Sequence, residues 1–138
     1  MKNYEFIEHT ADIGIRVGGV NLKALFANAA SAMFEIIAER KTPAYTALKS
    51  IKIAQQAENL EELFINWLNE LVSLSAAKNL IFSEFKIGLL ENKSLQAVVS
   101  GEDTAAFKLN TEIKAATYHQ LKLEQKESGW LAEVIFDV

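Results

Sequence analysis

Two segments with the apolar spacing of amphipathic helices constrain the fold of this chain more than any other feature. One follows Asn21 and is expected to run to about Glu39, and the other follows Asn59 and is expected to end near Asn79. In each, apolar residues recur every three or four positions and therefore share one helix face. Asparagine is favoured just before a first turn, and Glu62 stands where it would complete a capping box. Both apolar faces need a second layer to cover them.

Most of the remaining chain has the pattern of β-strands. Before and between the helices we expect strands at Tyr4–Glu8, Ile13–Val17 and Ser50–Gln56. After them we expect strands at Leu80–Leu90, Ser94–Ser100, Thr111–Lys126 and Trp130–Asp137, with turns at Glu91–Lys93 and Ser128–Gly129 and a polar loop at Gly101–Asn110. Short connections predict antiparallel neighbours. We therefore predict an α+β fold, a two-layer sandwich in which two amphipathic helices cover a mostly antiparallel β-sheet.

An internal similarity links the two helical segments. Residues 21–28 and 59–66 share the pattern N-L-x-x-L-F-x-N. A duplicated strand–helix unit would explain the match. So would convergence, because asparagine caps and apolar stripes dictate nearly all of the shared positions. Both explanations stay open from the sequence.

Composition and charge limit the class of protein. The 138 residues are 50% hydrophobic and include one proline, which fits a single folded domain over residues 1–138. The chain has no cysteine, so disulfides, zinc–thiolate sites and thiol nucleophiles are excluded. The net charge is −4 without a basic run, which disfavours strong direct nucleic-acid binding. With neither a signal-peptide pattern nor a membrane-spanning run, we expect a cytoplasmic protein without membrane contact.

Two aspartates near strand ends are the best candidates for a binding site. Asp12 closes a polar cluster that precedes a strand, and Asp137 ends the last strand. If these strands are neighbours, both carboxylates and the chain-end carboxylate could converge on one hard cation, with calcium, magnesium or manganese favoured over zinc. Each residue also has a simpler explanation. Asp12 could fix a turn or pair with Arg16, and Asp137 could simply be solvated.

The two histidines are weaker candidates. His9 belongs to the same polar cluster as Asp12, so it could join or orient a site there. His119 shares strand parity with Ile113 and Leu121, which predicts that it points toward the covered face of the sheet. A lone histidine in such a place is more often a hydrogen-bonded core residue than a ligand.

Several segments, taken in order, resemble the archease family over nearly the whole chain. They are Phe6–Gly14, Leu25–Ala30, Leu60–Leu63, Trp67–Leu71, Gly101–Glu102, Glu112–His119 and Phe136–Val138. The resemblance implies an accessory protein without catalytic activity of its own. Archeases assist RtcB-type RNA ligases in tRNA splicing and RNA repair, promoting GTP-dependent guanylylation of the ligase and its multiple turnover.

The resemblance also implies the site residues. The family's metal site maps onto Asp12, Asp137 and Val138, the last through backbone or terminal oxygens, and would hold a divalent cation. His9, Lys114 and His119 lie in family motifs and are expected to support the site or contact the partner. One departure is visible. The segment Asp103–Leu109 lacks the proline and histidine that many members carry there, so the resemblance gives this loop no role in metal or partner contact.

Two other functions remain as alternatives. A metal-dependent phosphoester hydrolase could use His9, Asp12 and His119. A metal-free protein-interaction or chaperone-like module would need none of these side chains for chemistry.

Overall fold

The computed structural model describes residues 3–7, 12–41 and 48–138, and both expected helices are present. Helix α1 spans Leu22–Ile37 and helix α2 spans Leu60–Lys78. The Oδ1 atoms of Asn21 and Asn59 each accept a hydrogen bond of 2.8 Å from the backbone N–H three residues on. Helix α2 ends at Asn79, whose φ of 54° is left-handed. The capping chemistry that marked the helix starts in the sequence is therefore confirmed.

The strands pair antiparallel throughout the described residues. They are β1 Tyr4–Ile7, β2 Ile13–Gly19, β3 Ala38–Arg40, β4 Lys49–Gln56, β5 Leu80–Leu90, β6 Ser94–Asp103, β7 Phe107–Leu109, β8 Ala115–Lys126 and β9 Gly129–Asp137. A four-stranded sheet has the order β1-β2-β9-β8, a three-stranded sheet has the order β4-β6-β5, and β3 pairs with β7. One turn of 3₁₀ helix, Thr104–Ala106, precedes β7.

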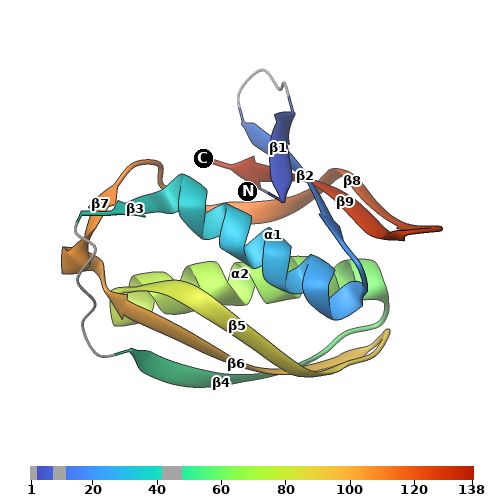
Figure 1. Cartoon of the computed structure of the whole chain (residues 1–138), viewed down its shortest axis with the longest axis horizontal. Coiled ribbons are helices and arrows are strands. Elements are labelled where there is room, and N and C mark those ends of the chain that lie inside the picture. Colours follow the sequence, from blue (N-terminus) through green and yellow to red (C-terminus); the bar gives the residue numbers. More distant parts are fainter. Residues whose placement is uncertain (1–2, 8–11, 42–47) are drawn as a thin grey trace.

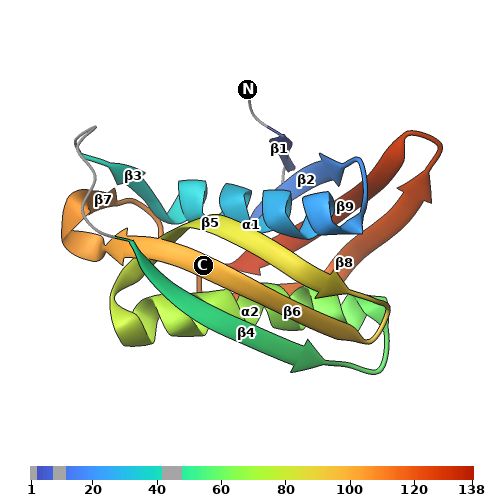
Figure 2. The same ribbon diagram turned by 60° about the horizontal axis from the view of Figure 1, so that its bottom comes forward.

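The two helices lie between the four-stranded and three-stranded sheets (Figures 1 and 2). Helix α1 packs on β2 and β5, and helix α2 packs on β8 and β5. Large aromatic side chains fill this central layer and are almost fully buried, among them Phe26, Phe64, Trp67, Phe82 and Phe136. The predicted α+β class, with two helices on mostly antiparallel strands, is confirmed. The strands form separate sheets, and each helix packs against the four-stranded sheet on one side and the three-stranded sheet on the other.

Three expected boundaries were wrong. The strand expected from Thr111 begins only at Ala115. The other two errors share one reason. The first helix stops at Ile37, because Ala38–Arg40 is extended and pairs with β7. The expected polar loop at Gly101–Asn110 contains the end of β6 and the whole of β7. Gly101 lies so close to β5 that an added Cβ would be 2.4 Å from the backbone oxygen of Ile81. In the first place long-range strand pairing overrides the local helical pattern, and in the second it overrides the local polar pattern.

A buried ion pair fastens the β3–β7 ribbon to β6. Glu102 is fully buried, and both its carboxylate oxygens contact the Arg40 guanidinium, with 3.2 Å between Oε2 and Nη1. The same guanidinium lies 5.0 Å from the centre of the Phe107 ring. Glutamate is tolerated in this interior because its charge is paired and doubly hydrogen-bonded.

The two strand–helix units, β2–α1 and β4–α2, share one further feature. Asn28 donates from its side chain to the carbonyl of Gly18 at 2.8 Å, and Gln55 donates to the carbonyl of Asn66 at 3.0 Å. Each helix is thus tied to its own strand at the matching asparagine position. Neither helix in the described part of the chain has the length and apolarity needed to cross a membrane.

Candidate functional site

The two candidate aspartates lie at the same end of the four-stranded sheet. Strand β2 pairs antiparallel with β9, and Ile13 stands opposite Phe136. Asp12 precedes Ile13 and Asp137 follows Phe136, so each aspartate stands one residue beyond the last pair at this end of the ladder. The condition set by the sequence, that the flanking strands be neighbours, is met (Figure 1).

The carboxylate of Asp137 falls on the outer face of this sheet. Phe136 is fully buried against the helices. Because side chains alternate along a strand, Asp137 points the other way. Asp137 is exposed and Asp12 is half-buried. Asp137 is therefore accessible to solvent or to a partner at this edge, and Asp12 lies one residue before the start of the neighbouring strand.

Strand β8 completes this edge on the other side of β9. The backbone N–H of Lys114 donates to the carbonyl oxygen of Asp137 at 2.8 Å, and Ala115 stands opposite Asp137. Val138 follows Asp137 and is 36% exposed. Asp12, Lys114, Asp137 and Val138 are therefore brought together, and we call this group the carboxylate edge.

The histidines have different outcomes. His9 lies outside the described residues. The prediction that His119 faces the helices was wrong, because His119 is exposed. Thr117 stands opposite Ile135 and Lys122 opposite Glu133, so four residues of β8 span the space of one residue of β9. This bulge, in which Gln120 has a φ of 53°, breaks the alternation from which the direction of His119 was inferred.

Asn69 supports the carboxylate edge and was not identified from the sequence. Its side chain, on helix α2, donates to the carbonyl of Ala116 at 3.1 Å and accepts from the N–H of Ala116 at 2.7 Å. The Asn69 amide therefore supplies hydrogen bonds to the edge strand β8 that a further strand would otherwise make. The available signal was an asparagine in the middle of a helix, where it is unfavourable unless its amide has a specific partner.

Ion pairs cover the outer face of the same sheet away from the carboxylate edge. Arg16, which the sequence allowed as a partner for Asp12, contacts the carboxylates of Glu5 and Glu133, with 3.1 Å between Nε and Oε2 of Glu133. The carboxylates of Glu5 and Glu133 raise the pKa of Arg16. Lys126, 2.8 Å from Glu124, lowers the pKa of that carboxyl. The cationic side chains in these pairs are therefore neutralised by carboxylates of the same sheet.

The donor chemistry of the carboxylate edge fits a hard divalent cation. Two carboxylates and the main-chain oxygens of Val138 are oxygen ligands, which calcium, magnesium and manganese prefer. Within residues 3–7, 12–41 and 48–138, no group of three His, Asp or Glu side chains is placed to hold a metal. A cation here would need main-chain oxygens, water or partner groups to complete its coordination, as magnesium sites commonly do.

Comparisons with known proteins agree over the full length. Residues 4–138 match the family model described as the Archease protein family (MTH1598/TM1083). A protein named "Protein archease" from Methanosarcina acetivorans is 37% identical, and the alignment covers 99% of this chain and 97% of that protein. Its namesake from Sulfurisphaera tokodaii is 34% identical with both chains fully covered.

Two solved structures share the fold. The solution structure of protein 1598 from Methanobacterium thermoautotrophicum superposes with a TM-score of 0.76, at 27% identity, with both chains fully covered. The crystal structure of TM1083 from Thermotoga maritima, named as an archease and possible chaperone, gives a TM-score of 0.66 at 27% identity. It covers 96% of this chain and 94% of that one.

Proposed function

The chain belongs to the archease family, and we propose that it is an accessory protein that activates an RtcB-type RNA ligase and has no catalytic role of its own. The observation that carries the proposal is the carboxylate edge. The opening and closing family motifs, more than a hundred residues apart in sequence, meet there through the pairing of β2 with β9.

The proposed role of each residue follows from the chemistry of nucleotidyl transfer. The ligase must accept guanylate from GTP, a step in which negative charge on the phosphates has to be neutralised. A calcium, magnesium or manganese ion would supply that neutralisation when bound. Asp12 and Asp137 would hold it with their carboxylates and Val138 with main-chain oxygens. Lys114 fixes the position of Asp137 through its backbone N–H.

The partner expected at this edge is the ligase, acting in tRNA splicing and RNA repair in the cytoplasm. The carboxylate edge lies at the end of the sheet, and the exposed Asp137 lies on its outer face, where another protein can reach it. The net charge of −4 supports a helper that leaves RNA binding to the ligase.

The test is a guanylylation assay with the purified cognate ligase, labelled GTP and divalent metal. We expect Asp12→Asn and Asp137→Asn each to reduce ligase–guanylate formation to the level of the ligase alone, because each removes one anionic ligand while keeping the side-chain shape. Asp103→Asn is the matched control. Asp103 caps the 3₁₀ turn by accepting from the N–H of Ala105, a bond that asparagine can also make. Full stimulation by both edge variants would refute the carboxylate role.

A chaperone-like function is the second candidate, because the Thermotoga relative is named as a possible chaperone. It predicts that the chain suppresses the aggregation of unrelated unfolded proteins, and that the two edge variants do so equally well. We expect no such suppression. A stoichiometric effect on light scattering by wild type and variants alike would favour this candidate over ligase activation.

A further inference from the structure

The outer face of the three-stranded sheet is open, on the side opposite the helices. Ile53, Ala97 and Val99 point inward and are buried. Lys52, Ala54, Gln96 and Val98, which alternate with them along the strands, point outward and are exposed. The register places Lys52 of β4, Val98 of β6 and Lys86 of β5 in one row across this face.

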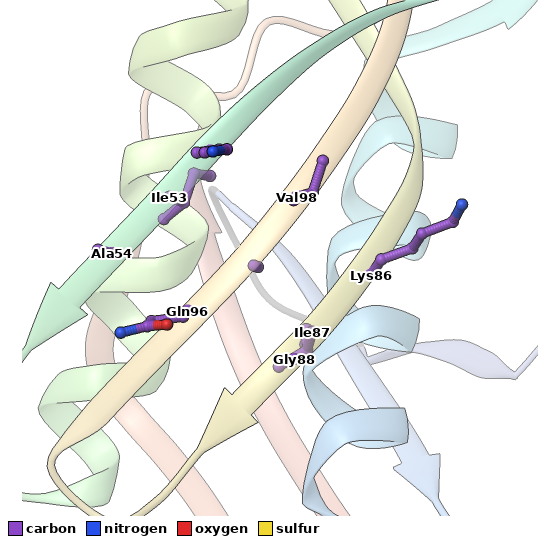
Figure 3. Close-up of a pocket in the computed structure, with 9 residues that line it drawn as sticks. Ile53, Ala54, Lys86, Ile87, Gly88, Gln96 and Val98 are labelled. Carbon is purple, nitrogen blue, oxygen red and sulfur yellow. The ribbon is translucent and has the colours of Figure 1, made fainter.

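This row borders a shallow hollow of about 700 Å³ (Figure 3). Its lining residues are Lys52, Ile53, Ala54, Lys86, Ile87, Gly88, Gln96, Ala97 and Val98. Val98 is 37% exposed on the central strand, and the Lys86 side chain extends away from β5. A Cβ added at Gly88 would meet nothing nearer than 3.9 Å, which shows that the space above β5 is unfilled. We call this region the lysine hollow.

The lysine hollow carries positive charge that the chain itself does not neutralise. Within the described residues neither Lys52 nor Lys86 forms an ion pair, although the cations on the other sheet do. The ammonium group of Lys23, on helix α1, donates to the carbonyl of Gly88 at 3.0 Å but does not line the hollow. Glu84 lies one row beyond Lys86, opposite Ser100, and does not line the hollow.

From this arrangement we infer that the lysine hollow is a docking site for an acidic segment of a protein partner, one with an apolar side chain between its carboxylates. Neighbouring strands are about 4.8 Å apart, so the backbones bearing the two lysines are separated by about 10 Å with Val98 between them. An apolar contact at the centre with charged contacts at its rim is the usual composition of a protein interface. None of the residues lining the hollow is aromatic, so the hollow offers no side chain for stacking bases.

This site is separate from the carboxylate edge. The helices lie between the two sheets, so their outer faces point away from each other (Figures 1 and 2). Both faces can therefore be occupied at once. The inference goes beyond activation of a ligase, because it adds a second contact surface of the opposite charge.

The experiment is a titration of the full, ¹⁵N-labelled chain followed by amide chemical shifts. The probe is a synthetic peptide of alternating glutamate and leucine. We expect the amide chemical shifts of Lys52, Lys86 and Val98 to change saturably with peptide concentration. The affinity should fall as salt is added, because salt screens the charges. Lys52→Glu/Lys86→Glu should lower the affinity by about tenfold or more, and Lys52→Gln/Lys86→Gln by less. Lys41→Glu/Lys108→Glu, which makes the same charge change outside the hollow, should bind as wild type does.

Three results would overturn the inference. The first is the absence of shifts at these amides up to millimolar peptide. The second is equal binding of wild type and Lys52→Glu/Lys86→Glu. The third is a stronger response at the same amides to oligouridylate than to the acidic peptide, which would assign the hollow to nucleic acid. None of these depends on the ligase assay, so the two proposals can fail separately.

Discussion

The two main sheets cover the same pair of helices but carry charge on their outer faces in opposite ways. On the four-stranded sheet, Arg16 contacts two carboxylates, and the acidic groups of Asp12 and Asp137 gather at one end. On the three-stranded sheet, Lys52 and Lys86 flank Val98 without an acidic partner among the described residues. The net charge of −4 for the whole chain does not reveal how charge is distributed on either face. Partners must therefore be inferred from local arrangements, which here predict a cation on one side and an acidic segment on the other.

The largest effect on stability is expected between these faces, where charge is buried. Arg40→Ala would leave the fully buried carboxylate of Glu102 without its guanidinium. We expect a loss of about 3–5 kcal/mol in the free energy of unfolding, measured by urea denaturation. The double variant Arg40→Met/Glu102→Leu should recover much of that loss, since it removes both charges. A change below about 1 kcal/mol for Arg40→Ala would mean that water reaches Glu102.

A smaller effect is expected at Asn69, which joins helix α2 to the outermost strand of the four-stranded sheet. Asn69→Ala would remove two hydrogen bonds to the backbone of Ala116 and leave those groups unsatisfied. We expect a destabilisation of about 1–3 kcal/mol, with faster hydrogen exchange at Lys114 and Ala116.

The control for Asn69 is Asn92→Ala, in the exposed turn between β5 and β6. If both variants unfold at the same urea concentration, then Asn69 does not hold the carboxylate edge in place.

The smallest effect is expected on the exposed ion pairs of the four-stranded sheet. Arg16→Ala should change the urea midpoint by no more than the error of the measurement, because exposed pairs are screened by water and salt. The carboxylate edge should also stimulate the ligase normally in this variant. A marked loss of stability would show that the Arg16 pairs with Glu5 and Glu133 are more than surface contacts.

Features set by local chemistry could be predicted from the sequence. The asparagine caps at Asn21 and Asn59, the helix end near Asn79 and the hairpin turn after Leu90 depend on residues a few positions apart. The sequence predicted that Asp12 and Asp137 lie close together only if their strands are neighbours. Which strands pair is decided by contacts between distant residues, so the local sequence does not determine it. The structure supplied the missing pairing of β2 with β9.

Features set by distant contacts could not be predicted. Glu102 was assigned to a loop as part of the polar segment Gly101–Asn110, yet Arg40, far earlier in the chain, makes its burial tolerable. His119 was assigned to the covered face because alternation was assumed to continue, and the bulge after Thr117 ends it. In both cases the error came from extending a local pattern across an irregularity fixed elsewhere in the fold.

The central claim, that the carboxylate edge holds a divalent cation, is tested most directly by paramagnetic broadening with manganese. Amide signals of Ile13, Ala115 and Asp137 should broaden first as Mn²⁺ is added, while that of Val98 in the lysine hollow stays sharp. Asp12→Asn/Asp137→Asn should abolish this selective broadening and leave the rest of the spectrum unchanged. Equal broadening in wild type and double variant, or broadening centred elsewhere on the molecule, would contradict the account.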